Sequence, residues 1–154
     1  MDDSENTLVM ELATGPVTIK LRPDLAPGHV ARIKELAREG FYDGVVFHRV
    51  IPGFMAQGGD PTGTGSGGSD KPNLKAEFSS EPHVRGVCSM ARTANPDSAN
   101  SQFFICFADA RFLDRQYTVW GEVTEGMDLV DGLPKGEPPR NPGKIVSMKV
   151  AADA

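Results

Sequence analysis

Apolar residues near the start of the chain recur at alternate positions, in short runs that glycine and proline interrupt. Residues 7–12 and 17–21 form two such runs, and Ala-Thr-Gly-Pro joins them. In the second run Val17, Ile19 and Leu21 share one face of an extended chain. A turn signal between two strand-like runs predicts a β-hairpin.

The period of the apolar positions changes after Pro23. They then recur at helical spacing, at Val30, Ile33, Leu36 and Ala37. Pro27 suits the first turn of a helix and Gly40 its C-terminal end. The sequence therefore predicts a helix over residues 27–38.

The remaining segments predict short strands between turn-rich loops, with one further short helix. Strands are expected at 45–57 (broken by a Pro-Gly kink), 86–90, 102–107, 118–123 and 145–150. The short helix is expected at 127–133, and loops at 60–72, 92–101 and 135–144. Many short strands with few helices predict a mainly β fold, a closed or nearly closed antiparallel barrel.

Length and charge narrow the class of protein. The 154 residues suit one domain, with an ordered core over 7–150 and frayed ends at 1–5 and 151–154. The net charge is −5 and no basic run is present, which argues against a nucleic-acid partner. No apolar run is long enough to span a membrane, and the acidic N-terminus does not resemble a signal peptide. We expect a monomeric cytoplasmic protein.

The cysteines and histidines show no pattern of a metal or nucleophilic site. Cys88 and Cys106 have apolar neighbours, which favours two buried thiols in a reducing compartment and leaves a disulfide open. His29, His48 and His83 lack the spacing of metal ligands, and the sequence contains no nucleophile elbow. We expect neither a metal nor a cofactor.

A glycine-rich stretch imitates a nucleotide-binding motif. Gly63, Gly65 and Gly68 satisfy Gly-x-Gly-x-x-Gly, but a dinucleotide site needs a strand before this pattern and a helix after it. Asp-Pro precedes the stretch and Asp-Lys-Pro follows it. It therefore predicts a surface loop whose glycines allow positive φ or the close approach of a ligand.

One arginine stands in an unusually apolar run, Phe-His-Arg-Val-Ile-Pro-Gly-Phe-Met-Ala-Gln-Gly-Gly-Asp at residues 47–60. Strand alternation places Arg49 on one face with Phe47 and Ile51. His48 falls on the opposite face, as expected of a hydrogen-bonded structural histidine. Because an unpaired buried charge is costly, Arg49 either pairs with a carboxylate or lines a pocket. The residues alone leave these two roles equally open.

A second apolar cluster follows at residues 102–107, Gln-Phe-Phe-Ile-Cys-Phe. Alternation along this strand places Gln102 and Phe104 on one face and Phe103 and Ile105 on the other. At least one of these two faces belongs to the hydrophobic core.

Residues 47–60 closely resemble the signature of the cyclophilins, a family of peptidyl-prolyl cis/trans isomerases. The resemblance continues through residues 86–91, Asn-Ser-Gln-Phe-Phe-Ile at 100–105, Phe-Leu-Asp at 112–114 and Val-Trp-Gly at 119–121. It covers about 7–150 without long insertions, as in compact bacterial members. The resemblance implies a closed eight-stranded antiparallel β-barrel that is capped by two α-helices, with the substrate groove on its outside.

Position by position, the resemblance implies a catalytic pair, Arg49 and Gln57. It implies a proline pocket of Phe54, Met55, Phe104 and Leu113. It implies substrate-binding flanks at Gly65, Ala91, Arg92, Thr93, Gln102, Phe112 and Tyr117. Simple alternation places Phe54 and Met55 on opposite faces, so a bend or bulge after the Pro-Gly kink must bring both to the site.

The implied activity is rotation of X-Pro bonds in peptides and in unfolded or loop segments of proteins, which assists folding. The alternative is a non-catalytic module or chaperone that holds proline-containing peptides in the same groove. Arg49 and Gln57 favour the enzyme, because binding alone needs only the apolar pocket. A hydrolase or oxidoreductase is disfavoured, because no nucleophile elbow or valid cofactor loop is present.

The flank departs from the usual family pattern at three places. Phe112 stands where many relatives carry Trp, and Tyr117 where many carry His. Arg92 and Thr93 replace a frequent Asn-Ala, in a loop that is one residue longer.

The first departure generates a prediction about an inhibitor. Many relatives bind the cyclic peptide cyclosporin through the indole N–H of that Trp, and Phe112 has no such donor. We therefore expect weak cyclosporin binding, measured by titration beside a Trp-bearing relative. Equally tight binding by the two proteins contradicts this expectation.

Overall fold

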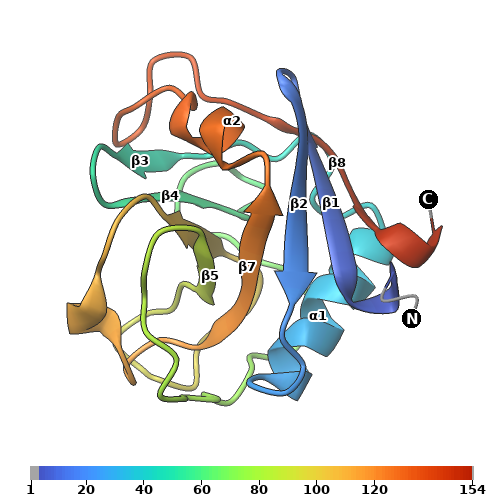
Figure 1. Cartoon of the computed structure of the whole chain (residues 1–154), viewed down its shortest axis with the longest axis vertical. Helices are drawn as coiled ribbons and strands as arrows, with labels where there is room; N and C mark the ends of the chain where they lie inside the picture. The colour runs from blue at the N-terminus through green and yellow to red at the C-terminus, as the bar shows by residue number, and fades with distance from the viewer. Residues whose placement is uncertain (1–3, 154) are drawn as a thin grey trace.

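The computed structural model describes residues 4–153, which contain one sheet of eight antiparallel strands (Figure 1). The strands are β1 (Thr7–Leu12), β2 (Gly15–Leu21), β3 (Arg49–Ile51), β4 (Met55–Gly58), β5 (Val87–Met90), β6 (Phe103–Cys106), β7 (Val119–Glu125) and β8 (Ile145–Val150). Their order in the sheet is β3-β4-β6-β5-β7-β2-β1-β8. The prediction of a mainly β fold with eight antiparallel strands is confirmed.

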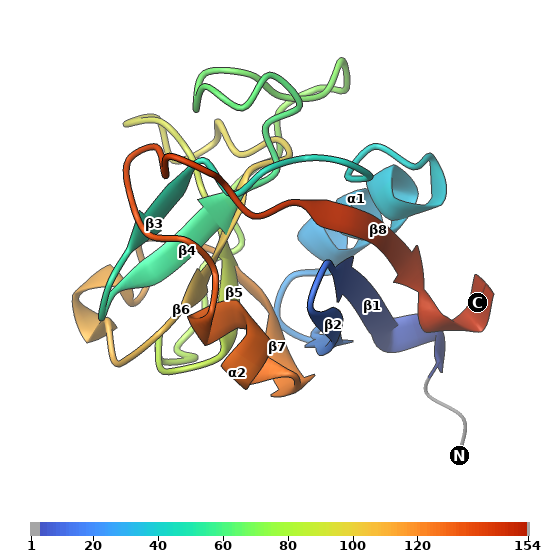
Figure 2. The same cartoon turned by 90° about the horizontal axis from the view of Figure 1, so that it is seen from above.

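The sheet curls into a half-barrel, so the predicted full closure is overstated. Strands β3 and β8 are the two ends of the hydrogen-bonded order, and they lie apart in the view of Figure 2. An isolated bridge between Val46 and Lys144 joins the segments that lead into these end strands. Single backbone hydrogen bonds also cross this gap: the N–H of Phe47 donates to the carbonyl of Gly143 and the N–H of Ile145 to that of Val45, both at 2.9 Å.

Two helices accompany the sheet, as predicted. Helix α1 (Pro27–Arg38) packs on β7 and β8, and α2 (Met127–Asp131) packs on β2 (Figures 1 and 2). Pro27 occupies the first turn of α1, and Gly40 beyond its end has φ +73°, a conformation that glycine adopts without steric cost. Helix α2 is two residues shorter than the predicted 127–133. Three short 3₁₀ turns, η1 (Ser4–Asn6), η2 (Arg111–Leu113) and η3 (Ala151–Asp153), complete the described elements.

The first hairpin follows from the alternation of its residues. Leu8, Met10 and Leu12 of β1 are buried, as are Val17, Ile19 and Leu21 of β2. Their polar neighbours point to the other side of the sheet. Both strands therefore present one apolar face to the core, as their sequences predict.

Alternation fails at the start of β3. The strand begins only at Arg49, and the two residues before it, Phe47 and His48, are both buried while Arg49 is exposed. The predicted common face of Phe47 and Arg49 is therefore wrong, because the period of two applies only within a strand. His48 is structural in the sense of being buried, but its Nδ1 has no hydrogen-bond partner within residues 4–153.

Described residues from both ends of the chain, which the sequence analysis expects to be frayed, lie in short 3₁₀ turns that contact α1 through ion pairs. Glu5 in η1 pairs with Lys34 and Arg38 of α1, at 2.7 and 2.9 Å. Asp153 in η3 pairs with the same Arg38 at 2.8 Å. Arg38 therefore joins the two ends of the chain to one helix, while residues 1–3 and 154 lie outside the described part.

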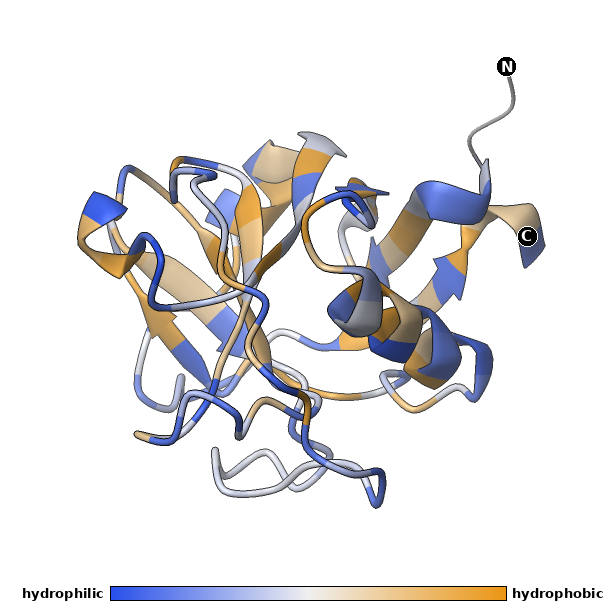
Figure 3. Cartoon of the chain, turned by 90° about the horizontal axis from the view of Figure 1, so that it is seen from below, coloured by the Kyte–Doolittle hydropathy of each residue, from blue (hydrophilic) through white to orange (hydrophobic). Residues whose placement is uncertain are grey.

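An aromatic cluster lies at the centre of the core. The ring of Phe103 contacts Tyr42, Phe47 and Trp120 edge-to-face, with centroid distances of 5.5, 6.2 and 5.8 Å. Such T-shaped pairs add to the gain from burial alone. In Figure 3 the strands and α1 carry alternating hydrophobic and hydrophilic colours, whereas the long loops are mostly pale or blue.

Both cysteines are free and buried, which confirms the prediction of two apolar thiols. Burial raises the pKa of Cys88 well above its usual value, and that of Cys106 to about 12. Neither thiol is therefore a ready nucleophile. Within residues 4–153 no helix is both long and apolar enough to cross a membrane.

The aromatic cluster leads to a prediction about stability. Phe103 is fully buried, so Phe103→Ala should cost about 3–5 kcal/mol of the free energy of unfolding, measured by urea denaturation. The matched control is Phe112→Ala, since Phe112 is 67% exposed and its truncation should change stability by only about 0.5 kcal/mol. Equal losses in the two variants contradict the central role of Phe103.

Candidate active site

A small cavity of about 130 Å³ opens on the side of β4 and β6 that faces away from the aromatic cluster. Its lining consists of Arg49, Phe54, Met55, Gln57, Ala91, Arg92, Phe104, Leu113 and Tyr117. All of these belong to the site predicted from the sequence. The structure thus brings together residues that are up to 68 positions apart in the chain, from Arg49 to Tyr117.

A larger cavity of about 760 Å³ adjoins the small one and holds most of the predicted flank. Gly65, Thr93 and Gln102 line it, and it shares Gln57, Ala91 and Arg92 with the small cavity. The two cavities together form one groove. Among the predicted site residues Phe112 lies outside both linings, but its ring packs on that of Phe54 with the centroids 5.6 Å apart.

The floor of the small cavity is an apolar cluster separate from the main core. Met55 and Phe104 are its buried members beside the cavity, and Phe54, Ala91, Leu113 and Tyr117 pack around them. Met55 comes from β4 and Phe104 from β6, two strands that pair in antiparallel register. Phe103, the neighbour of Phe104, belongs to the main core. The predicted division of residues 102–107 into two faces is confirmed.

Phe54 and Met55 reach the same cavity because only one of them lies in a strand. Met55 is the first residue of β4, whereas Phe54 belongs to the tight turn before it. Gly53 in this turn has φ +71°, and the N–H of Phe54 donates to the carbonyl of Ile51 at 3.1 Å. The predicted bend is therefore the turn of the β3–β4 hairpin, and the two strands pair up to this turn without a bulge.

Arg49 combines the two roles that its sequence context left open. Its Nε donates to Oε1 of Glu137 at 3.0 Å, and its Nη1 donates to Oε1 of Gln57 at 3.4 Å. Arg49 and Gln57 are cross-strand partners in the β3–β4 ladder. Arg49 therefore pairs with a carboxylate and also lines the cavity, so the two roles do not exclude each other.

A chain of amide groups connects Arg49 to the glycine-rich loop. Gln57 donates through Nε2 to Oε1 of Gln102 at 3.0 Å. Gln102 in turn donates through Nε2 to the carbonyls of Gly65 and Gly67, at 3.0 and 2.9 Å. Each amide is oriented by both of its neighbours, which gives the groove a wall of fixed, uncharged polar groups.

The glycine-rich loop is organised around one buried carboxylate, Asp60. Backbone N–H groups of Thr62, Thr64, Gly65 and Gly67 donate to it. Gly63 and Gly65 have positive φ, as predicted for a loop of this composition. Burial alone raises the pKa of Asp60, but hydrogen bonds from Thr62, Gly67 and Gly65 outweigh it and hold the pKa far below its usual range.

Two of the departures on the flank contact each other. The guanidinium of Arg92 lies 4.6 Å from the ring centre of Tyr117, a cation–π contact. It also donates to the carbonyl of Gln116 at 2.6 and 3.0 Å and to that of Thr93 at 2.9 Å. Tyr117 meets Phe104 edge-to-face at 5.7 Å. Arg92 thus joins the loop at 92–93 to the segment that closes the pocket.

A buried histidine supports the floor from behind. His83 contacts Asp114 through Nδ1 and Ser89 through Nε2, each at 3.0 Å, and its ring stacks on Phe104. These three residues have the types of a hydrolase triad, but Ser89 and His83 are completely buried. Burial lowers the pKa of His83, while Asp114 acts in the opposite direction. Sequence reasoning missed this support, whose partners are distant in the chain.

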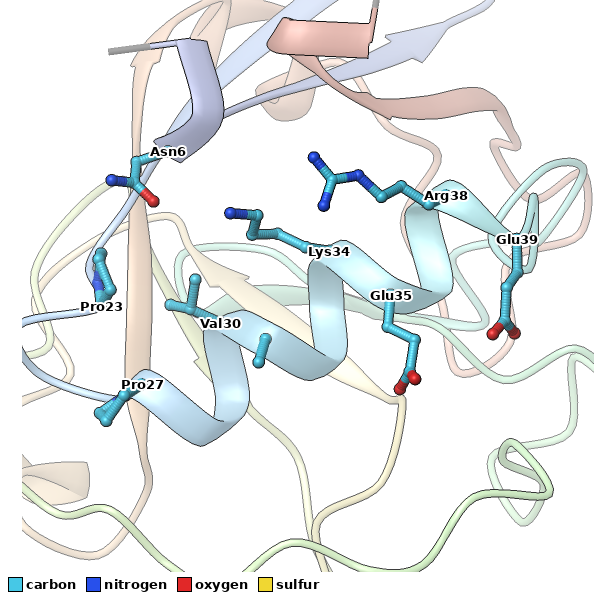
Figure 4. A pocket seen from close by; sticks show the side chains of 9 residues that line it. Asn6, Pro23, Pro27, Val30, Lys34, Glu35, Arg38 and Glu39 are labelled. Carbon is cyan, nitrogen blue, oxygen red and sulfur yellow. The ribbon is translucent and has the colours of Figure 1, made fainter.

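A separate hollow of about 580 Å³ lies on the outer face of α1 and contains none of the predicted site residues (Figure 4). Figure 4 shows Lys34 and Arg38 on one side of the helix and Glu35 and Glu39 on the other. Lys34 and Arg38 pair with Glu5, and Glu39 pairs with Lys71. These charged groups are therefore engaged in ion pairs within the protein, and we do not count this hollow as part of the candidate site.

The geometry of the groove agrees with a comparison of the whole chain with protein families. The family model "Cyclophilin type peptidyl-prolyl cis-trans isomerase/CLD" matches residues 7–150. The chain belongs to the cyclophilin family. The resemblance found in the motifs is thereby confirmed across the domain.

Individual relatives of this cyclophilin carry the name of the same activity. A "Probable peptidyl-prolyl cis-trans isomerase" of Brucella suis biovar 1 is 54% identical over 167 aligned positions, covering 98% of this chain and 85% of that protein. "Peptidyl-prolyl cis-trans isomerase B" of Bacillus subtilis is 45% identical over 123 positions, covering 79% of this chain and 85% of that protein. This cyclophilin is accordingly a peptidyl-prolyl cis-trans isomerase.

Solved structures of other cyclophilins have the same fold. The cyclophilin AquaCyp293 from Hirschia baltica has a TM-score of 0.91 and 35% identity, over 99% of this chain and 76% of its own. A cyclophilin-type isomerase of Cryptosporidium parvum, solved in the presence of the dipeptide Ala-Pro, has a TM-score of 0.87 and 27% identity. That alignment covers 94% of this chain and 98% of the Cryptosporidium chain.

The carboxylate under the glycine-rich loop generates a prediction about pH. Asp60→Asn replaces an acceptor of several N–H groups by an amide, which should cost about 1–3 kcal/mol of unfolding free energy at neutral pH. The native pKa is depressed, so the ionised form stabilises the fold fully above the unfolded value of about 3.9 and progressively less below it. The difference between wild type and variant should therefore shrink as the pH falls.

Urea denaturation at a series of pH values measures this difference. Asp70→Asn is the control, because Asp70 is an exposed aspartate of the same loop region. A difference for Asp60→Asn that does not change with pH contradicts the ionised anchor.

Proposed function

We propose that Arg49 is the catalytic residue of this cyclophilin, and that the apolar floor of the small cavity beside it holds the proline ring of an X-Pro substrate. The observation that carries the proposal is that Arg49 lines the same small cavity as Met55 and Phe104. Arg92, the other arginine of the lining, donates to the backbone carbonyls of Gln116 and Thr93. Gln57 contributes by orienting Arg49 through the cross-strand hydrogen bond.

The chemistry of amide rotation explains why an arginine suits this position. Resonance holds the peptide bond planar with a barrier of about 18–20 kcal/mol, and uncatalysed X-Pro exchange takes tens to hundreds of seconds. When the bond twists, conjugation is lost and the lone pair of the prolyl nitrogen becomes an acceptor. A donor aimed at this nitrogen bonds to it only in the twisted state, which is selective binding of the transition state. No covalent bond forms or breaks.

The apolar cavity supplies the second requirement, a fixed proline ring. If the ring stays seated against Phe54, Met55, Phe104 and Leu113, rotation moves the preceding residue and its carbonyl. The burial of the ring contributes about 25 cal/mol per Å² of apolar area, and this gain does not depend on the neighbouring residues. The Cryptosporidium relative in the presence of Ala-Pro supports a proline-containing peptide as the ligand of this groove.

The larger cavity accounts for the rest of the peptide. Its wall includes the amide side chains of Gln57 and Gln102 and residues 91–93, a set of mostly uncharged groups that suits an extended chain more than a particular side chain. We therefore propose broad selection of X-Pro segments in peptides and in unfolded or loop regions of proteins. The non-catalytic binding module uses the same groove and differs in needing no donor at Arg49.

The other predictions about the molecule stay predictions. Cell fractionation tests the cytoplasmic location, and sedimentation equilibrium tests the monomeric state. Neither result bears on the chemistry of the groove.

The catalytic role leads to a prediction about Arg49. Arg49→Ala should lower kcat/KM by about 10² or more, at roughly 1.36 kcal/mol per tenfold change in rate. Arg49→Lys keeps the charge but loses the planar fork of donors, so it should recover only part of the rate. The measurement is NMR exchange spectroscopy on an Ala-Pro-Phe type peptide with catalytic amounts of protein.

The matched control for this prediction is Arg85→Ala. Arg85 is as exposed as Arg49 (49% against 44% for the side chains), pairs with Asp131 at 2.6 Å and lines neither cavity of the groove. It should leave the exchange rate unchanged. Near-normal exchange with folded Arg49→Ala would refute the catalytic role and favour the binding module.

A further inference from the structure

The loop at residues 134–144 is attached to β3, the strand that carries Arg49. The N–H of Gly136 donates to the carbonyl of Val50, and the N–H of Val50 donates to the carbonyl of Gly136, both at 2.8 Å. This reciprocal pair is an isolated antiparallel bridge on the free edge of β3. In Figures 1 and 2 the loop between α2 and β8 passes alongside β3.

This attachment places Glu137 next to Arg49. Glu137 follows Gly136 and Arg49 precedes Val50, so an antiparallel bridge between Gly136 and Val50 brings these two side chains to adjacent positions. Oε1 of Glu137 accepts a hydrogen bond from Nε of Arg49 at 3.0 Å. The contact links residues 88 positions apart, and both side chains are about half exposed.

We propose that Glu137 is a positioning residue, which fixes the guanidinium of Arg49 for isomerisation. The proposal rests on the proposed catalytic role of Arg49. Glu137 binds Nε from the loop, and Gln57 accepts from Nη1 on β4. Two anchors from different elements define the plane of the guanidinium. The described contacts use two of its five N–H donors and leave three for a substrate.

The exposure of Arg49 makes an external anchor necessary. A long side chain that is half in water samples many rotamers, and ordering it during the reaction costs entropy. An anchor that is already present in the free enzyme removes that cost from the catalytic step. Glu137 contacts Nε, the guanidinium nitrogen nearest the backbone. It therefore orients the group without blocking the two terminal nitrogens, Nη1 and Nη2.

The experiment compares Glu137→Ala, Glu137→Gln and wild type by NMR exchange on an Ala-Pro-Phe type peptide. Glu137→Ala should lower kcat/KM about two- to fivefold, the effect expected of an exposed ion pair, with kcat carrying most of the loss. Glu137→Gln keeps an acceptor oxygen, so its kcat/KM should lie between those of Glu137→Ala and wild type. Glu125→Gln, which removes one negative charge at the end of β7, is the control and should match wild type.

Two further readouts separate positioning from a general effect on the loop. The Nε–H signal of Arg49 should exchange faster with water in Glu137→Ala, because its acceptor is gone. In an Arg49→Ala background the change at Glu137 should have no further effect on kcat/KM. Protection of the Val50 and Gly136 amides from hydrogen exchange reports whether the loop stays attached to β3. If Glu137→Ala releases the loop, the near-isosteric Glu137→Gln tests the positioning role instead.

Failure of this proposal is distinguishable from failure of the proposed function. If wild type and Arg49→Ala accelerate exchange equally, the catalytic role of Arg49 itself is refuted. If wild type is active and Arg49→Ala is not, an unchanged kcat/KM in Glu137→Gln and Glu137→Ala with the loop attached overturns the positioning role alone. A higher kcat/KM in these variants also overturns the positioning role, because it means that the contact with Glu137 keeps Arg49 from binding the substrate.

Discussion

The alternation of side chains along β6 is the constraint on which both the fold and the groove depend. Phe103 enters the aromatic core, and the next residue, Phe104, forms the floor of the small cavity. One strand is therefore apolar on both faces, which is unusual for an antiparallel sheet with one face toward water. The apolar face that points away from the main core must also be shielded from water. Phe54, Leu113 and Tyr117 pack against it but shield only part of it. The space that they leave is the proline pocket that we propose.

Around this apolar floor the polar groups of the groove are fixed by partners from distant segments. Asp60 gathers the N–H groups of the glycine-rich loop, and that loop gives its carbonyls to Gln102. Gln102 orients Gln57, and Gln57 contacts Arg49. A continuous chain of hydrogen bonds thus runs from the buried carboxylate of Asp60 to the exposed guanidinium of Arg49 and holds the polar groups of the groove in place. Such preorganisation suits a reaction whose catalysis consists of donors that are aimed before the substrate twists.

The sequence predicted those features that depend on neighbours in the chain. The hairpin, α1 and β8 follow from local periodicity, and a motif resemblance located the groove. Alternation failed between Phe47 and Arg49, because the strand begins later than the apolar run. The pairing of Arg38 with Glu5 and Asp153 was not predicted, because these residues are far apart in the chain. Glu137 was not found, because an acidic residue in a Pro- and Gly-rich loop carries no signal for a partner 88 positions away.

The flank shows why departures from a family pattern are better interpreted in pairs. Taken singly, Arg92 adds a cation beside a peptide groove and Tyr117 removes an imidazole. In the structure the guanidinium lies on the ring of Tyr117, and its N–H groups donate to the carbonyls of Gln116 and Thr93. These donors are therefore directed at the protein, and the ring that they cover also contacts Phe104. The two replacements together build one wall of the pocket, so changing either residue alone affects the other's packing as well as its own contacts.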